Sequence, residues 1–360
     1  MASQREFVRV EDGLPPFYVG VDLGGTTVKL GLVDDRGLTI AWDSIDTEVQ
    51  TGPEDASRRI GEAVRRLIQT ARVEPSAVAR VGLGSPGTLD IPAGIMINPM
   101  NFPGWGAFPI RDRVAEHSGL PVAFVNDASA AAYGEFWVGS GREFQSMILL
   151  TLGTGVGCGI IIGNLIIEGE HGFGTECGHI VIDFGDNARM CPCGHSGHLE
   201  AYASANAVIK RTQEALDSGR PSSLLQRLAH GATLSPLLVA EEAEAGDELA
   251  DQIVMDTACY LGVGIVTLVH TIDPSGVLLG GAMTFGVRDS KLGRRFLRRV
   301  QQEFRRRTFP VLAEKTKIDF ATLGGDAGYL GAAGIARLEH EKATCPDAGR
   351  QLTRDREALV

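Results

Sequence analysis

The sequence predicts an α/β protein of two lobes, and three observations support this fold class. The chain has 360 residues, 44% of them hydrophobic, which is enough to bury a large core and favours two packed lobes over one. Two similar units of strand, glycine-rich turn and strand lie far apart in the chain, which indicates a duplicated architecture. Strands alternate with helices along the remainder. Two lobes imply a cleft between them, where a ligand would bind.

The first of the two similar units is residues 17–33, FYVGVDLGGTTVKLGLV, and the second is residues 147–162, MILLTLGTGVGCGIII. In both, runs rich in β-formers flank a turn of Gly and Thr.

The segments around these units alternate in type. The irregular, Gly- and Pro-rich residues 85–109 form too long a connection to be neutral and are predicted to be a substrate loop. The other predicted elements are helices at 54–72, 205–218, 240–269 and 292–307 and strands at 78–84, 122–125 and 276–279. We expect a small N-terminal α/β lobe over 1–120, completed by a helix near 326–340, a large lobe over 121–325, and a polar tail over 341–360.

The charge of the chain disfavours nucleic acid and anionic membranes as partners. The formal net charge is −11, so the field of the protein repels phosphodiester backbones. No apolar run is expected to reach the roughly 20 residues that span a bilayer, and the N-terminus lacks the hydrophobic segment of a secretory signal. We therefore expect a cytoplasmic protein that acts on a small ligand. Six cysteines are too few for a disulfide scaffold in a chain of this length.

Three glycine turns that follow apolar strands are candidate nucleotide-binding segments. Asp22 ends the first apolar strand, beside glycines whose amides can approach phosphate oxygens, and it could orient Mg²⁺ through water. For this turn alone, a hairpin with an Asp cap is about equally favoured. The other two turns, at residues 153–155 and 280–281, also follow apolar strands, and the three together favour phosphate binding. The predicted nucleotide-binding residues are Asp22, Gly24, Gly25, Thr26, Thr27, Lys29, Gly153, Thr154, Gly155, Gly280 and Gly281.

Two other nucleotide-binding patterns are absent. The sequence has neither a Walker-type lysine loop nor a Gly-x-Gly-x-x-Gly strand-to-helix fingerprint. A P-loop enzyme and a dinucleotide oxidoreductase are therefore disfavoured.

Asn126 and Asp127 follow the predicted strand at 122–125, at the end of a strand where α/β folds bind ligands. Asp127 could act as a general base that takes a proton from a sugar hydroxyl. The alternative is a plain helix N-cap, which Asp forms well and which is favoured when this pair is considered alone.

A cluster of Cys and His is the most specific stretch of the chain. His179, Cys191, Cys193 and His198 offer four ligands, the number required by a closed tetrahedral zinc site, so the zinc would be structural. His195 competes with His198 as the fourth ligand. The same loops carry Glu176 and Glu200, whose carboxylates suit the recognition of sugar hydroxyls.

Seven arginines between residues 294 and 307 suggest a polyanion site. Their interleaved apolar residues recur at helical spacing, so the solvated face of an amphipathic helix is the preferred interpretation.

These motifs resemble the ROK family of bacterial repressors and sugar kinases from about residue 18 to about residue 336, and within it the glucokinase branch. The matching segments are Asp22-Leu-Gly-Gly-Thr, Asn126-Asp127, Glu176-x-Gly-His179, and the segment from Cys191 to Glu200. The resemblance implies an actin-like, ribonuclease-H-like (hexokinase-type) fold, with Mg·ATP in the cleft and Asp127 as the base. It also implies that the sugar is bound by Gly87, Asn101, Asn126, Asp127, Glu176, His179 and Glu200.

One position departs from the family pattern, because His198 stands where the family has a third cysteine. Imidazole is a competent zinc ligand, so a Cys₂His₂ site is expected in place of Cys₃His. The family's repressors carry a winged helix-turn-helix before the first motif, and the 21 residues that precede Asp22 are too few for one.

The expected activity is ATP-dependent phosphorylation of glucose to glucose 6-phosphate, in a homodimer or homotetramer. The alternatives are a kinase for fructose, mannose, allose or N-acetylmannosamine, a polyphosphate-dependent glucokinase, and a non-catalytic sugar sensor. The intact Asp127 argues against the sensor.

Overall fold

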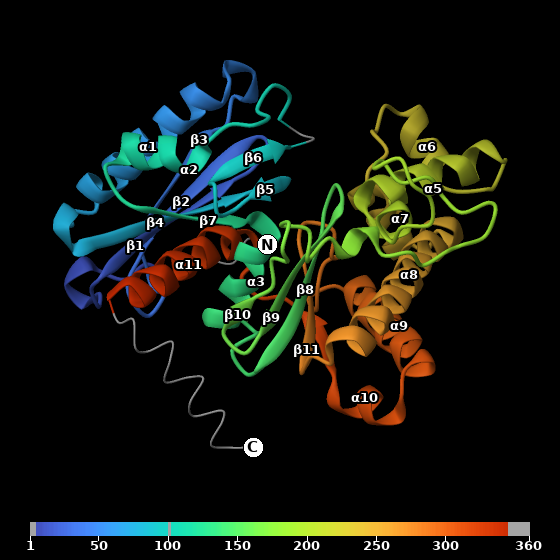
Figure 1. The fold of residues 1–360 in the computed structure, drawn as a ribbon. Helices are drawn as coiled ribbons and strands as arrows, with labels where there is room; N and C mark the ends of the chain where they lie inside the picture. Colours follow the sequence, from blue (N-terminus) through green and yellow to red (C-terminus); the bar gives the residue numbers. More distant parts are fainter. Residues whose placement is uncertain (1–4, 100–101, 345–360) are drawn as a thin grey trace. The chain divides into compact units, whose positions relative to one another are not determined.

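A computed structural model describes residues 5–99 and 102–344. The chain divides into two compact units (Figure 1). Of the described residues, unit 1 comprises 5–99, 102–142, 168–174 and 325–344, and unit 2 comprises 143–167 and 175–324.

Unit 1 is a five-stranded sheet with helices on both faces (Figure 1). The strand order is β3-β2-β1-β4-β7, with antiparallel pairing among β3, β2 and β1 and parallel pairing among β1, β4 and β7. These strands are β1 Phe17–Leu23, β2 Thr27–Val33, β3 Thr39–Asp46, β4 Val78–Ser85 and β7 Val122–Asn126. The helices are α1 Pro53–Thr70, α2 Ile110–Ser118, α3 Asp127–Trp137 and α11 Ala327–Thr344. α11 packs on β1, β4 and α3, and α1 packs on α2 and β2.

Unit 2 repeats this sheet. Its order is β10-β9-β8-β11-β12, again with antiparallel pairing among the first three strands and parallel pairing among the last three. The strands are β8 Ser146–Leu152, β9 Val156–Ile162, β10 Leu165–Ile166, β11 Gly276–Gly280 and β12 Lys317–Phe320. The same order and the same senses in both units confirm the duplicated α/β architecture.

The helices of unit 2 form one continuous hydrophobic core with this sheet. They are α4 Glu200–Ala203, α5 Ala205–Asp217, α6 Leu224–Ala229, α7 Pro236–Ala245, α8 Glu248–Ile272, α9 Lys291–Arg307 and α10 Pro310–Lys315. By length and composition α8 could span a membrane, contrary to the expectation that no segment would. Its apolar residues, such as Leu261 and Ile265, are buried in the hydrophobic core of unit 2. The apolar face of α8 is therefore covered by protein.

The boundary between the units lies later in the chain than the sequence suggested. Residue 120 was the expected end of the first lobe, but β7 pairs with β4 through Ser85 and Asn126, and α3 packs on α11. Strand β7 and helix α3 therefore belong to unit 1, together with Asp127. At the C-terminus, α11 continues to Thr344, beyond the expected start of the polar tail at residue 341, and residues 345–360 lie outside the described part.

Two further segments differ from their predictions. The helix predicted at 240–269 is two helices, because Gly246, at φ +100°, ends α7 and Asp247 caps α8 through the Ala250 N–H. The stretch 85–109, predicted to be irregular, contains the antiparallel hairpin of β5 Thr88–Asp90 and β6 Ile95–Asn98.

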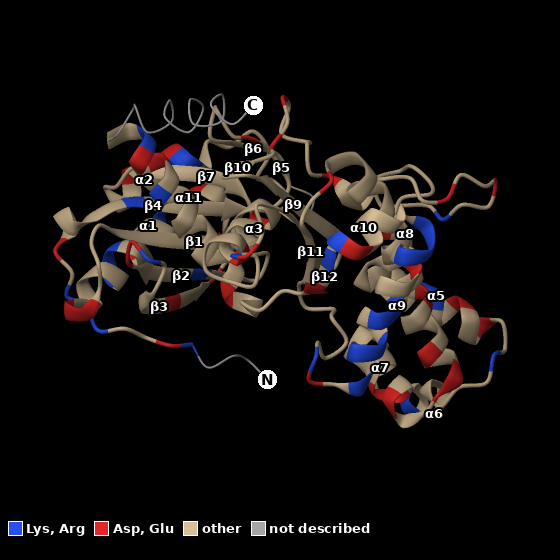
Figure 2. Cartoon of the chain, turned by 90° about the horizontal axis from the view of Figure 1, so that it is seen from below, with Lys and Arg blue, Asp and Glu red and all other residues tan. Residues whose placement is uncertain are grey.

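The arginine-rich segment forms α9, whose basic residues are visible as blue bands in Figure 2. Glu303 is 2% exposed and forms ion pairs with Arg299, Arg306 and Arg307. Glu303 lies on the face of α9 that packs against α8, where a Cβ on Gly262 would be 2.7 Å from the Glu303 Cβ. The amphipathic interpretation of this helix is confirmed, and several of its arginines are engaged within the protein.

Candidate active site and metal centre

The predicted site residues of unit 1 gather where its parallel strands end. Asp22 on β1 pairs with Gly84 on β4, and Ser85 pairs with Asn126 on β7. The register therefore brings Asp22 to the edge of the sheet from which Asn126 and Asp127 emerge. Gly87 follows β4 in a left-handed conformation, φ +84°, that favours glycine.

Capping at the start of α3 falls to Asn126 rather than Asp127. The Asn126 Oδ1 accepts hydrogen bonds from the N–H groups of Ala128, at 2.9 Å, and Ser129, at 3.3 Å. Asp127 is the first residue of the helix, and its Oδ1 also accepts from the Ala128 N–H at 2.8 Å. A carboxylate in the first turn is favoured by the helix dipole. The Asn126 side chain therefore supplies two cap hydrogen bonds to α3, and Asp127 supplies a further one to the Ala128 N–H.

The turn between β1 and β2 is stabilised by hydrogen bonds from Thr47, a residue outside the turn. Within it, the Gly24 N–H donates to the Thr27 carbonyl at 3.1 Å. Thr47, which is fully buried, donates its hydroxyl to the Gly24 carbonyl at 2.6 Å and its N–H to the Thr26 carbonyl at 2.8 Å. The carbonyls of the turn are thus turned toward Thr47. Around Gly25 there is no atom within 4 Å of an added Cβ, so the tip of the turn is open.

Asp22 lies beneath this turn in a protein-lined environment. Burial raises the pKa of its carboxyl group, and the Lys29 ammonium opposes this rise. Lys29, its neighbour in register on β2, donates to the Gly325 carbonyl at 2.9 Å. A bound cation would act in the same direction as Lys29: it would lower the pKa of Asp22 and favour the ionised form.

In unit 2 the structure brings the two predicted glycine turns together. The Met283 N–H donates to the Leu152 carbonyl at 2.9 Å, and a Cβ on Gly281 would lie 2.3 Å from the same oxygen. Gly281, at φ +88°, thus lies against the end of β8, and Gly153–Gly155 follows directly. Gly153 donates its N–H to the Gly155 carbonyl at 3.0 Å, which closes the turn.

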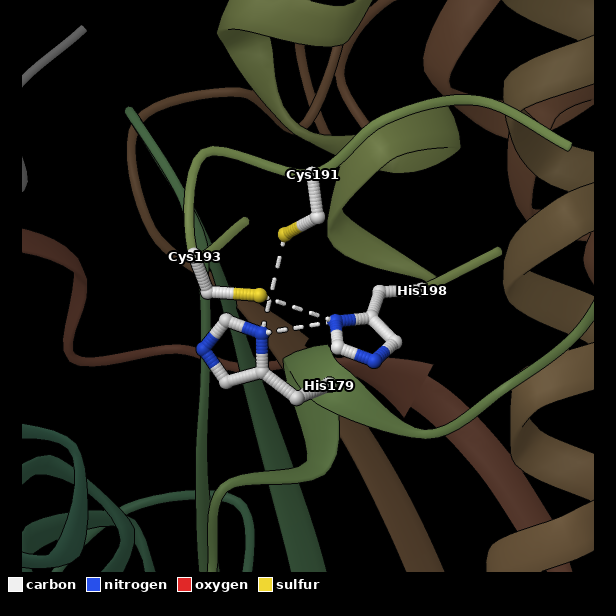
Figure 3. A group of neighbouring side chains, drawn as sticks. All are labelled: His179, Cys191, Cys193 and His198. Carbon is white, nitrogen blue, oxygen red and sulfur yellow. Dashed lines mark hydrogen bonds between the residues drawn. The ribbon is translucent and has the colours of Figure 1, made fainter. Parts of the chain in front are cut away.

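The Cys and His side chains predicted to bind a metal form one compact cluster (Figure 3). One ligand atom from each of His179, Cys191, Cys193 and His198 lies within 4.8 Å of all the others. His179 Nδ1 lies 3.7 Å from Cys191 Sγ and 3.3 Å from His198 Nδ1, and His198 Nδ1 lies 3.2 Å from Cys193 Sγ. His198 completes the group, whereas His195 uses its carbonyl to accept the Cys191 N–H at 2.8 Å and exposes its side chain.

These separations suit a tetrahedral zinc ion. With Zn–N and Zn–S bonds of about 2.0 and 2.3 Å, the ligand atoms of a tetrahedral site are about 3.3–3.8 Å apart. On the far side of its ring, His179 Nε2 is 3.8 Å from Glu176 Oε2. A carboxylate near the second nitrogen of a ligand histidine is a common means of orienting it.

A tyrosine supports the loop that carries the two cysteines. The Tyr202 hydroxyl donates to Asp183 Oδ2 at 2.6 Å and accepts from the Arg189 N–H at 2.7 Å. Its ring packs against Tyr260 of α8, with ring centroids 4.8 Å apart. The loop is therefore anchored to the helical core of unit 2.

Residues 18–339 match the model of the ROK family. This chain belongs to the ROK family. A glucokinase of Halalkalibacterium halodurans is 33% identical over 323 residues, which cover 90% of this chain and 96% of that protein.

Two solved ROK structures are similar to the chain over most of its length. The ROK hexokinase of Thermus thermophilus is 31% identical with a TM-score of 0.76 and covers 91% of this chain and 99% of its own. A ROK glucokinase of Streptomyces griseus, solved in complex with glucose and AMPPNP, is 31% identical with a TM-score of 0.72 and covers 89% of this chain and 99% of its own. The two-lobed sugar kinase fold expected from the ROK motifs is thereby confirmed.

Sequence reasoning missed several residues that shape these sites. Thr47 lies outside every ROK motif and carries no local signal. Gly328, which covers Asp22, ends the run Gly324-Gly-Asp-Ala-Gly328, which leads into the first turn of α11, and the glycine content of this run was an available signal. Asn101, predicted to bind the sugar, lies outside the described residues.

Proposed function

We propose that this chain is an ATP-dependent glucokinase that transfers the γ-phosphoryl group of ATP to the 6-hydroxyl of glucose. The observation that carries this proposal is its similarity, over most of both chains, to a ROK glucokinase solved with glucose and an ATP analogue. The position of Asp127 supports it, since this residue directly follows β7 at the edge of the sheet where the parallel strands end.

In unit 1 we assign the chemical step to Asp127. Its carboxylate takes the proton of the sugar hydroxyl as that oxygen attacks the γ-phosphorus, and the P–O bond to ADP breaks. Asn126 offers its side-chain NH₂ to the sugar while its oxygen caps α3, and Gly87 and Asn101 contribute the neighbouring loop. Asp22 would hold Mg²⁺ through water. The phosphates of the nucleotide would be approached by Gly24, Gly25, Thr26, Thr27 and Lys29.

In unit 2 we assign Glu176, His179 and Glu200 to the sugar, and the turns at Gly153–Gly155 and Gly280–Gly281 to the nucleotide. The sugar-binding side chains provide donors and acceptors for a neutral polyol. They include no Arg or Lys that would pair with a carboxylate or phosphate on the substrate. A neutral hexose is therefore the favoured acceptor.

An assay of ADP release over a panel of hexoses tests the proposal. Glucose should give the highest kcat/KM with ATP among glucose, fructose, mannose, allose and N-acetylmannosamine, and ATP should exceed polyphosphate as donor. A higher kcat/KM for another hexose would replace glucose as the substrate and leave the kinase activity intact. No ADP release with any of them would reject the kinase.

We also propose that His179, Cys191, Cys193 and His198 bind one structural zinc ion per chain. The separations of their ligand atoms support this assignment. The four protein ligands close the coordination sphere, so the ion would hold the loops that carry Glu176 and Glu200 and take no part in phosphoryl transfer. Elemental analysis of the purified protein tests the stoichiometry.

The expected assembly rests on family resemblance, and the expected location rests on the N-terminal sequence, which lacks the hydrophobic segment of a secretory signal. We propose a cytoplasmic homodimer or homotetramer. Light scattering coupled to size-exclusion chromatography distinguishes these two states from a monomer.

A further inference from the structure

The peptide groups on either side of Val156 are contacted by both segments that carry the Cys and His cluster. The Val156 N–H donates to Glu200 Oε2 at 3.0 Å. On the other side, a Cβ on Gly178 would lie 2.3 Å from the Val156 carbonyl oxygen, so the Gly178 backbone lies directly against it. Gly178 precedes the ligand His179, and Glu200 follows the ligand His198 by two residues. Any movement of the two ligand-bearing segments therefore reaches Val156.

Val156 is the residue that directly follows the glycine turn. A Cβ on Gly155 would lie only 2.3 Å from Glu200 Oε2, so glycine at this position leaves the space that the carboxylate occupies. The Gly153 carbonyl accepts the N–H of Ala205, the first residue of α5, at 2.9 Å. The turn is thus tied at both ends to the segment that begins with Glu200.

The second carboxylate oxygen of Glu200 faces the cluster, with Oε1 3.9 Å from Cys191 Sγ. One side chain therefore lies between a candidate metal ligand and the glycine turn. We propose that Glu200 is a positioning residue that couples metal occupancy of the cluster to the shape of the Gly153–Gly155 turn, and so to nucleotide affinity. This inference rests on the proposed function in one respect, the assignment of this turn to the nucleotide.

The coupling has a direct physical basis. Gly178 and Glu200 both contact Val156, and their positions would be fixed if a bound metal drew the four ligands together. A hydrogen bond from an N–H group to an ionised carboxylate is about twice as strong as a neutral one. Free-energy coupling between two sites commonly changes affinity by about 5- to 150-fold. We expect an effect of about tenfold, because one charged hydrogen bond carries most of the connection.

The test measures AMPPNP affinity of the full-length protein by calorimetry, with zinc added and after removal of zinc by a chelator. Zinc should tighten AMPPNP binding by about tenfold in the wild type. It should also slow amide hydrogen exchange in a peptide that covers residues 153–158.

Two variants break the connection in different ways. Glu200→Gln keeps the shape of the side chain and removes its charge. Gly155→Ala keeps Glu200 and displaces its carboxylate, which sits at the end of a flexible side chain. In Gly155→Ala the effect of zinc on AMPPNP affinity should fall below about twofold, as expected when a coupling hydrogen bond is lost. In Glu200→Gln the amide oxygen still accepts the Val156 N–H, but with about half the strength, so the effect should fall to about threefold.

Gly153→Ala is the matched control in the same turn, because its added Cβ meets no atom within 4 Å. Its AMPPNP affinity should still respond to zinc as the wild type does. If Gly155→Ala keeps the full zinc effect, the proposal is wrong. It is also wrong if Glu200→Gln weakens only glucose binding and leaves the zinc-dependent amide exchange unchanged, since Glu200 would then be a sugar ligand alone.

Thermal melting identifies a variant that does not fold, and the near-isosteric Glu200→Gln then decides the question. The exchange measurement needs no kinase activity. A zinc-dependent exchange response in a protein that phosphorylates no hexose would reject the proposed function and retain the coupling. Glucose phosphorylation without that response would reject the coupling alone.

Discussion

Gly328 lies directly over the carboxylate of Asp22: a Cβ on residue 328 would be 2.5 Å from both Cγ and Oδ2 of Asp22. Gly328 belongs to the first turn of α11, and Asp22 lies near the end of β1, so residues some 300 positions apart in the chain define one surface of the candidate phosphate site. The absence of a side chain at residue 328 therefore sets the position of Asp22.

We predict that Gly328→Ala impairs nucleotide use. Helix propensity alone would make this change favourable by about 1 kcal/mol. The overlap with Asp22 acts against it, and overpacking of this kind commonly costs about 1–3 kcal/mol. The KM for ATP should rise, with a smaller rise for glucose, in steady-state assays that vary each substrate.

Gly325→Ala is the control for this prediction. Its added Cβ would have Lys29 Nζ, the end of a flexible side chain, as its nearest neighbour at 3.4 Å. Its effect on the KM for ATP should be clearly smaller. Equal effects of the two substitutions would mean that the whole Gly-rich run is sensitive and that the contact with Asp22 has no special role.

The sequence predicted which candidate site residues lie together better than it predicted the residues that support them. Asp22, Asn126 and Asp127 were singled out because each lies at or directly after the end of an apolar strand, and parallel strands bring their carboxyl ends to one edge. Thr47 and Gly328 were missed because their contacts join segments distant in the chain, and no periodicity or spacing reports such contacts. The hexokinase-type fold came from family resemblance, whereas the duplication was visible in the two strand-turn-strand units.

One local error and one choice that the sequence left open have physical causes. The helix predicted at 240–269 ignored the Gly246-Asp247 pair, which combines a left-handed C-terminal residue with a strong N-cap. The choice between His195 and His198 could not be made from spacing. It depends on the tight turn in which Cys191 bonds the His195 carbonyl, which leaves the His195 ring exposed.

We predict that His198→Ala removes zinc and that His195→Ala does not. His198 Nδ1 lies within 3.3 Å of ligand atoms of both His179 and Cys193, so its loss opens the coordination sphere. The loss in zinc affinity should exceed the roughly 10–100-fold typical of outer-shell partners. Chelator competition measures the affinity of both variants. Zinc lost from His195→Ala and retained by His198→Ala would reassign the fourth ligand.

We predict that Glu303→Gln destabilises unit 2 in a pH-dependent manner. Burial alone would raise the pKa of Glu303, but hydrogen bonds from Arg306 and Arg307 outweigh it, and the pKa is lowered. A lowered folded-state pKa contributes stability above the unfolded pKa, and this contribution is lost as the pH falls through the folded value. The variant should lose about 1–3 kcal/mol of unfolding free energy near pH 7.

Urea unfolding at several pH values checks this prediction. The difference between the wild type and Glu303→Gln should be constant from neutral pH to about pH 5 and should shrink below about pH 4. Glu314→Gln, on the exposed surface of α10, is the control and should change the unfolding free energy by less than about 0.5 kcal/mol. A difference for Glu303→Gln that does not vary with pH would point to packing against α8 as its cause.

The last prediction separates the chemical role of Asp127 from a structural one. Asn126 caps α3, so Asp127→Asn keeps the cap and the shape of the side chain and removes the base. A general base commonly contributes about 10²–10⁴-fold, so kcat should fall by at least about 10²-fold. Glucose affinity by calorimetry should change little, and the melting temperature should stay near that of the wild type.

Asn126→Ala should show the opposite pattern in stability. It removes the acceptor of the Ser129 N–H and one of the two acceptors of the Ala128 N–H, and should lower the unfolding free energy by about 1 kcal/mol. Asn126→Asp should restore that stability, because Asp caps helices as well as Asn does. If Asp127→Asn retained kcat and lost stability as Asn126→Ala does, Asp127 would be part of the cap, and the base would have to be sought elsewhere.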